Sequence, residues 1–300
     1  MGRYSNQRDC LRQIVENLLN SVICRIKWQY IGNLTTREFM RITGILLSIF
    51  ALSGCDMLFP MTATKICEEH SEFCDDLNPD GWCLAEKSRI IKHRYAYQQS
   101  PSELLDYYLL EDFEKYKVCI NKAAQIEHIV QVEKQTKRRQ AAVNAERELN
   151  RLVRKTRNSK EPHLLLYHWS RFGKQDALTH FLALEKQGKL NTASLQLGLA
   201  SYYVKFDLEK AKGALYKALA LYTEEQDIDT NIFVSLSTIN LKQENYPEAY
   251  VWAYLAHEFK VENISLTDIR NALPASSDIT SLEDKAEQYK EEIDDRVFSL

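Results

Sequence analysis

Four cysteines are the residues of this sequence whose spacing most clearly indicates chemistry. Cys67, Cys74 and Cys83 lie in a loop-like stretch, and Cys119 follows in a stretch with helical periodicity. Four cysteines allow three disulfide pairings, and their spacing does not choose among them. Zinc is the alternative, but six and eight intervening residues lack the close C-x2–4-C pair of structural zinc sites. We therefore expect two disulfides, as in an exported protein.

A second group of side chains has the spacing of calcium ligands. In the stretch DLNPDG, Asp76, Asn78 and Asp80 alternate before Gly81, as at the start of an EF-hand loop. Side chains on every second residue of a tight loop converge on one hard cation. The twelfth position of such a loop should be glutamate, and here it is Lys87. Because Asn-Pro-Asp-Gly is also a strong turn signal, we favour a turn and keep calcium as the alternative.

No motif of a known enzyme class is present in the sequence. It contains no GxSxG, no HExxH and no P-loop. Its seven histidines include no pair with metal-ligand spacing, although His163 and His168 lie near each other. We expect each histidine to be a core or surface residue, and we expect no catalytic residue and no cofactor. An active site assembled from distant positions would escape this search.

The stretch from Met40 to Pro60 has the layout of an N-terminal signal peptide. Arg41 precedes ten uncharged residues, 42–51, and this apolar run is shorter than the roughly 20 residues that a transmembrane helix needs. The following Leu-Ser-Gly-Cys resembles the lipobox of bacterial lipoproteins, so residues 40–54 would be a signal peptide and Cys55 the lipidated N-terminus. Acyl chains on Cys55 would anchor the protein in a membrane. Asp56 resembles an inner-membrane retention signal, and the outer membrane is the alternative.

Residues 1–39 then precede the signal peptide. We interpret them as an upstream extension from a misplaced start codon; a functional amphipathic helix is the alternative, because eight apolar residues share a helical face. Removing residues 1–54 takes away seven of 39 Lys/Arg and three of 42 Asp/Glu, which leaves 32 against 39 and a net charge of −7. An acidic chain of this kind is a poor candidate for nucleic-acid binding.

The composition predicts that helices position these residues. Only nine Gly and six Pro occur in 300 residues, and long stretches are rich in Ala, Leu, Glu, Lys and Tyr. We expect an all-α fold with a Cys-rich stapled segment (55–99), long charged helices (100–160), helical repeats (161–262) and C-terminal capping helices (263–300).

Residues 100–160 show helix signals and a strong positive charge. Ser100, Pro101 and Glu103 predict an N-cap, a first helical position and a capping box. Cys119 would face the stapled loop from this helix, so that one disulfide joins loop and helix. From 133 to 160, ten Lys/Arg stand against three Asp/Glu. Attraction to anionic lipids is one interpretation, and we favour a solvated helix face.

A repeat of helical hairpins follows. At an offset of 38 residues, Leu208 aligns with Tyr246, Ala211 with Ala249, and Ala218 with Ala256. This pattern resembles a tetratricopeptide or Sel1-type repeat, and 163–190 fits a looser first hairpin. Asn245 is expected to cap the last of these helices, and Ser281 a final acidic helix. Three hairpins suffice for a small solenoid.

Several stretches together resemble one family over nearly all of residues 55–300. They are the lipobox, the first three of the four cysteines, KHRYAY, YKVC, LLLYHWSRFG and AYVWAYLAHEF. Together they are similar to a lipoprotein family of gammaproteobacteria that is known as a domain of unknown function. The resemblance implies a bacterial host and an envelope location, and it supplies no catalytic residues.

The functional expectation is a lipid-anchored periplasmic scaffold or adaptor that holds a protein or peptide in a helical groove. The candidate groove residues are Tyr202, Tyr203, Trp252 and Tyr254, with core packing as the alternative for at least half of them. The second hypothesis is a cell-wall enzyme or a regulator of one, and the third a calcium-stabilised envelope factor.

Overall fold

The computed structural model describes residues 61–127, 131–262 and 264–299. These ranges contain twelve α-helices and no strand, which confirms the expected all-α fold. The upstream segment 1–39, the signal peptide 40–54 and the lipidation candidate Cys55 lie outside the described residues. The chain divides into two compact units, 1–69 and 70–300. In the first unit the described part is residues 61–69 with the short helix α3 (Ala63–Glu69).

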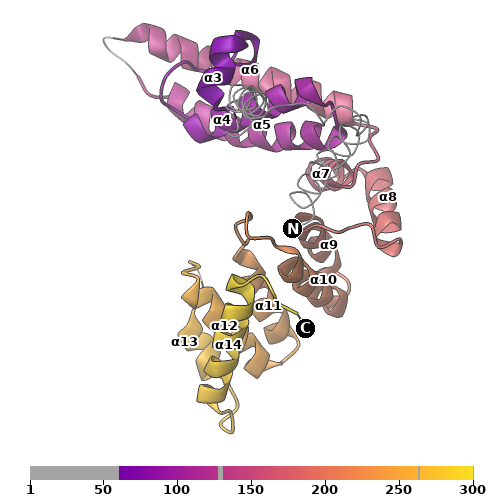
Figure 1. Ribbon diagram of the computed structural model, residues 1–300. Coiled ribbons are helices and arrows are strands. Elements are labelled where there is room, and N and C mark those ends of the chain that lie inside the picture. Colours follow the sequence, from indigo (N-terminus) through magenta and orange to yellow (C-terminus); the bar gives the residue numbers. More distant parts are fainter. Residues whose placement is uncertain (1–60, 128–130, 263, 300) are drawn as a thin grey trace, which may run out of the picture. The chain divides into compact units, whose positions relative to one another are not determined.

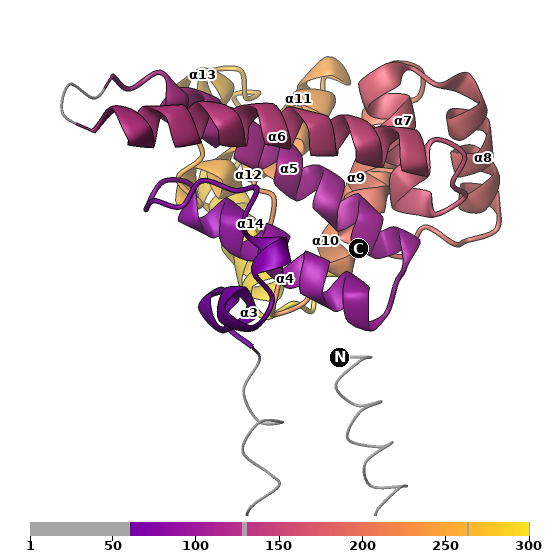
Figure 2. The same ribbon diagram turned by 90° about the horizontal axis from the view of Figure 1, so that it is seen from above.

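The second unit begins with the turn η2 (Ser71–Phe73) and three helices, α4 (Leu84–Gln99), α5 (Glu103–Ala124) and α6 (Val132–Thr156). α5 packs against both α4 and α6, and Figure 2 shows α6 lying along it. Helix α5 begins two residues later than expected, because Ser102 rather than Ser100 is its N-cap and accepts a hydrogen bond from the backbone N–H of Leu105.

The charged helix α6 is held by small residues. Ala141, Ala145 and Leu152 are buried, whereas Ala142, Leu149 and Val153 are only half-buried. The buried alanines allow α6 to approach its neighbour closely. Most of the charged residues of α6 lie on the other faces of this amphipathic helix and remain at the surface. The favoured interpretation of a solvated helix face therefore fits this helix.

Three helical hairpins follow. Their helices are α7 (Pro162–Phe172) and α8 (Gln175–Lys186), α9 (Ala193–Tyr203) and α10 (Leu208–Leu221), and α11 (Asn231–Lys242) and α12 (Tyr246–Glu258). The two helices of each hairpin pack against each other, as Figure 1 shows. Gly173, at φ 64°, ends α7 in the left-handed conformation that glycine adopts without strain.

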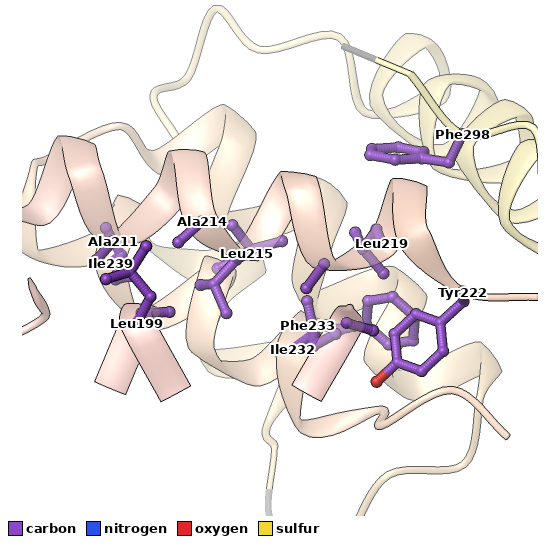
Figure 3. Close-up of a cluster of buried hydrophobic side chains, with 14 of the residues drawn as sticks. Leu199, Ala211, Ala214, Leu215, Leu219, Tyr222, Ile232, Phe233, Ile239 and Phe298 are labelled. Atoms are coloured by element: carbon purple, nitrogen blue, oxygen red, sulfur yellow. The ribbon is translucent and has the colours of Figure 1, made fainter. Parts of the chain in front are cut away.

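The 38-residue repeat corresponds to real structure. α10 and α12 begin at Leu208 and Tyr246, the two aligned positions, and follow the N-caps Asp207 and Asn245. All four aligned alanines are fully buried. Figure 3 shows Ala211 in the core cluster, near Leu199 and Ile239 from neighbouring helices. The repeat therefore marks the positions where helices meet.

Two C-terminal helices complete the unit, α13 (Leu266–Asn271) and α14 (Ile279–Asp294), and both pack against α12. Tyr289 of α14 stacks on Trp252 with ring centroids 5.3 Å apart. Asp278, rather than Ser281, caps α14 and accepts a hydrogen bond from the Ser281 backbone N–H. The expected cap was therefore three residues too late.

Candidate functional site

The disulfide between Cys83 and Cys119 joins the loop before α4 to helix α5, with the two Cα atoms 5.9 Å apart. Cys67 and Cys74 are disulfide-bonded as well, which confirms the expectation of two disulfides. Cys119 also faces the loop from a helix, as expected. A disulfide of this kind stabilises the folded protein, because it limits the conformational freedom of the unfolded chain.

Arginine side chains form ion pairs with the carboxylates of the calcium-like loop. Both guanidinium Nη atoms of Arg94 donate to the carboxylate of Asp76, at 2.6 and 2.7 Å. Nε of Arg138 donates to Oδ2 of Asp80 at 2.7 Å, and Arg138 is almost fully buried. Charge-assisted hydrogen bonds of this geometry are among the strongest in proteins. The loop is thereby tied to α4 and α6.

Lys87 fills the centre of the same loop. Its Nζ donates to the carbonyl oxygen of Asn78 at 2.8 Å and to that of Asp80 at 2.6 Å, and the side chain is buried. Tyr116 donates its hydroxyl proton to Oδ1 of Asn78 and accepts from the Asn78 backbone N–H, both at 2.9 Å. Desolvation lowers the pKa of Lys87, against the opposing effect of the Asp80 charge.

These contacts favour the turn interpretation over the calcium alternative. The side-chain oxygens of Asp76, Asn78 and Asp80 accept hydrogen bonds from other groups of the protein and do not surround an open site. Over the described residues, no three side chains of His, Cys, Asp or Glu come together as metal ligands. The turn interpretation of DLNPDG accounts for the geometry.

The histidines are structural where they are buried. His163 contacts Glu161 at 2.8 Å through Nδ1 and Thr192 at 3.2 Å through Nε2. His168 contacts Thr156 at 2.9 Å. In α4, His93 contacts Asp112 at 2.6 Å, and Arg89 donates to the same buried carboxylate. The contacts with Thr192, Thr156 and Asp112 join neighbouring elements, so these histidines help to hold the helices together.

The four candidate groove residues differ in their burial and in their contacts. Trp252 is fully buried against Phe233 and Tyr289, and its indole N–H donates to Glu248, so it belongs to the core and not to a groove. Tyr254 is half-buried and donates to Glu287 of α14 at 3.2 Å. Trp252 was a wrong groove candidate, because aromatic side chains from α10, α11, α14 and the segment after α14 pack around it.

Tyr202 and Tyr203 belong to an aromatic cluster that reaches the surface. We define this aromatic cluster as Trp169, Tyr202, Tyr203 and Phe206. Tyr202 lies at its centre, with ring centroids 5.7 Å from Trp169, 5.2 Å from Tyr203 and 5.3 Å from Phe206. Phe206 is 73% exposed, while Trp169 and Tyr202 are half-buried. The cluster therefore presents apolar area from α7, α9 and the turn after α9.

The setting of the aromatic cluster favours binding rather than catalysis. Tyr203 donates to the carboxylate of Glu185 in α8 at 2.8 Å, and the ammonium of Lys210 lies 5.1 Å from its ring. These contacts fix Tyr203, whose ring lies against that of Tyr202. Contiguous exposed aromatic side chains mark interaction sites more often than single ones do. The sequence did not single out Trp169 or Phe206, because it does not show that α7 packs beside α9.

Comparison with protein families places the chain. Residues 52–254 match the family described as Protein of unknown function (DUF2989), and this protein belongs to that family. The match covers more than half of the chain and begins at Leu52, the first residue of the lipobox-like stretch. No curated protein and no solved structure matches the chain. Among the described helices, none has the length and apolar character needed to span a bilayer.

Proposed function

We propose that this protein is a lipid-anchored scaffold on the periplasmic face of the bacterial envelope, where it holds a protein or peptide against its helical hairpins. The observation that carries this proposal is the aromatic cluster. Tyrosine and tryptophan are enriched among the few residues that carry most of the binding energy at protein interfaces, and aromatic rings bury a large area. Phe206 and Tyr202 offer such area on the hairpin of α9 and α10.

The envelope part of the proposal rests on the sequence around Cys55. A charged residue, a short apolar run and a lipobox-like stretch occur in the order of a lipoprotein signal, and the family match begins within that stretch. Two disulfides agree with an oxidising compartment. A lipoprotein of a gammaproteobacterial inner membrane is the finer form of this proposal, with Asp56 as the retention signal.

The support for a protein partner is the way the hairpins present their side chains. α9 and α10 pack through buried alanines and leucines, so that the turn between them carries Phe206 outward on a rigid base. A rigid helical array gives up little conformational entropy when it binds. The partner that fits is a protein segment with apolar side chains, and nucleic acid is disfavoured by the net charge of −3.

Photocrosslinking in the native host tests the interaction. A photoreactive phenylalanine analogue replaces Phe206 in the full chain, and the matched control carries it at Lys217, which is exposed on α10 outside the aromatic cluster. We expect one reproducible crosslinked protein from position 206 and not from 217. Tyr202→Ala should weaken that crosslink by about tenfold, as for an interface hot spot.

Two results would contradict this proposal. One is the same set of crosslinked proteins from positions 206 and 217, which would show only random collision. The other is an unchanged crosslink in Tyr202→Ala when the variant retains its helical circular dichroism. A crosslink that depends on Tyr202 and identifies the same protein in repeated cultures supports the scaffold function.

A further inference from the structure

A small basic pocket lies in the second unit, and none of its lining residues belongs to the aromatic cluster. Its volume is about 220 Å³, and it is lined by the loop after α6, by α7 and by the first turns of α8. Buried Leu165 and Ala177 contribute its apolar part. The pocket is smaller than sites for drug-sized ligands, which begin at about 300 Å³. Its occupant must therefore be small.

Three cationic side chains surround the pocket, Arg157, Lys160 and Lys174. The single carboxylate at the pocket is that of Asp176, whose side chain is 65% exposed and lies 3.5 Å from Lys174. Within the described part of the chain, Arg157 and Lys160 form no ion pair with any carboxylate. The pocket therefore has an excess of positive charge in a chain whose net charge is −3.

Lys160 is positioned by one hydrogen bond and keeps further N–H donors that a ligand could use. His180 donates from Nδ1 to the carbonyl oxygen of Asp176 at 2.7 Å, because a carbonyl can only accept. Its Nε2 is then the acceptor of the neutral imidazole, and Lys160 Nζ donates to it at 2.7 Å. An ammonium has three N–H donors, so two remain for a ligand. The histidine thus positions Lys160 without neutralising it.

His168, on the buried side of the pocket, is also affected by the nearby positive charges. Thr156 donates its hydroxyl proton to the Leu152 carbonyl, so its oxygen accepts from Nε2–H of His168 at 2.9 Å. Burial lowers the pKa of His168, and the charges of Lys174 and Arg157 lower it further, against opposing effects of the Thr156 hydrogen bond and the Asp176 charge. Cations placed beside a buried imidazole, with only the exposed Asp176 to offset them, favour an anion in the space between.

We propose that this pocket binds a small oxyanion of the phosphate class. A phosphate group carries more than one negative charge and several acceptor oxygens, which matches one guanidinium and two ammonium groups around a small space. The volume excludes a polymer from the pocket, and an apolar ligand would leave the cations unsatisfied. Free phosphate and the phosphate of a lipid headgroup share this chemistry.

Isothermal titration calorimetry of the full chain with inorganic phosphate tests the proposal. Ionic strength is held constant with sodium chloride, so that screening is the same at every point. We expect saturable binding of one phosphate per chain. Heats that match those of a chloride titration at the same ionic strength would overturn the proposal.

Variants separate the pocket from general surface charge. Arg157→Gln and Lys160→Gln each remove a cation that has no ion pair with any described residue, and each should weaken phosphate binding by about tenfold, as for the loss of one charge-assisted hydrogen bond. Lys217→Gln, a lysine exposed on α10, is the matched control and should leave the affinity unchanged. An equal loss in Lys217→Gln would overturn the assignment to this pocket. Unchanged melting temperatures show that the variants fold.

A second titration distinguishes the two sources of phosphate. Vesicles of phosphatidylglycerol in phosphatidylcholine are compared with phosphatidylcholine alone for binding of the full chain and of Arg157→Gln. A loss of phosphatidylglycerol-dependent binding in the variant assigns the pocket to a lipid headgroup. Phosphate binding that depends on Arg157, with vesicle binding that does not, assigns it to a free phosphate or phosphomonoester.

Discussion

The ammonium nitrogen of Lys87 lies 2.6 Å from the carbonyl oxygen of Asp80, inside the loop whose spacing is that of a calcium site. Lys87 is the residue at the twelfth position, where a calcium loop needs glutamate. The positive charge inside the loop is therefore that of a lysine side chain of the same protein. Arg94 and Arg138 complete this arrangement by pairing with Asp76 and Asp80.

Lys87→Met should destabilise the protein. The substitution keeps the volume of the side chain but leaves the carbonyl oxygens of Asn78 and Asp80 without the Lys87 donor. We expect a loss of about 1–3 kcal/mol in the free energy of unfolding, the cost of unsatisfied buried groups. Urea denaturation measures it, with Lys92→Met, an exposed lysine of the same helix, as the control. Equal stability of the two variants would contradict the role of Lys87.

The effect of Asp80→Asn should depend on pH. Desolvation raises the pKa of Asp80, but hydrogen bonds from the Trp82 N–H, Arg138 and Asn78 outweigh it and hold the pKa below its ordinary value. The unfolded chain then binds the proton more readily than the folded protein, so this stability is present above the ordinary pKa and is lost as the pH falls through the folded one.

We therefore expect Asp80→Asn to be clearly less stable than wild type at pH 7, and the difference to shrink as the pH falls below about 4, where Asp80 itself takes up a proton. Urea denaturation at a series of pH values checks this. A difference that stays constant from neutral to acid pH would show that the charge of Asp80 contributes nothing.

Removal of the Cys83–Cys119 disulfide should have a large effect. The bond closes a loop with a sequence separation of 36 residues. The chain-entropy model gives about 3–4 kcal/mol for a loop of this size. The double variant Cys83→Ala/Cys119→Ala should lose this amount in urea denaturation and should keep its helical circular dichroism. An unchanged denaturation midpoint would contradict the role of the bond as a staple.

Two glycines in neighbouring helices should respond differently to substitution by alanine. A Cβ at Gly198 would lie 2.3 Å from Cδ2 of Leu166, whereas a Cβ at Gly213 would meet no atom within 4 Å. Gly213→Ala should stabilise the protein by about 0.5–1 kcal/mol, because alanine favours a helix. Gly198→Ala should gain nothing or lose about 1 kcal/mol, because Leu166 must move. Thermal unfolding of both variants compares them, and equal gains would show that α7 and α9 do not pack closely at this point.

Much of the fold could be predicted from the sequence, because local patterns determine where helices form. The alanines at 211, 218, 249 and 256 revealed the hairpin contacts, since only small residues fit where two helices touch. Helix starts were less certain. Ser100 and Ser102 both stand before the same helix, and the structure uses Ser102 because its side chain reaches the Leu105 N–H.

The candidate site was harder to predict, because it depends on which helices meet. The cysteines indicated two disulfides but not the Cys83–Cys119 pairing, which requires α5 to pass beside the loop. Trp252 and Tyr202 looked alike in the sequence, as aromatic residues of repeated helices. Packing of α14 against α12 buries Trp252, while Tyr202 stays at the edge of its hairpin.

Intact mass spectrometry of the protein purified from its native membranes tests the central claim of a lipid-anchored envelope protein most directly. We predict a chain that begins at Cys55 and carries the added mass of acyl chains, with a further gain on reduction that corresponds to two disulfides. A chain that begins at Met1 and carries no lipid would contradict the anchor and the export on which the scaffold function depends.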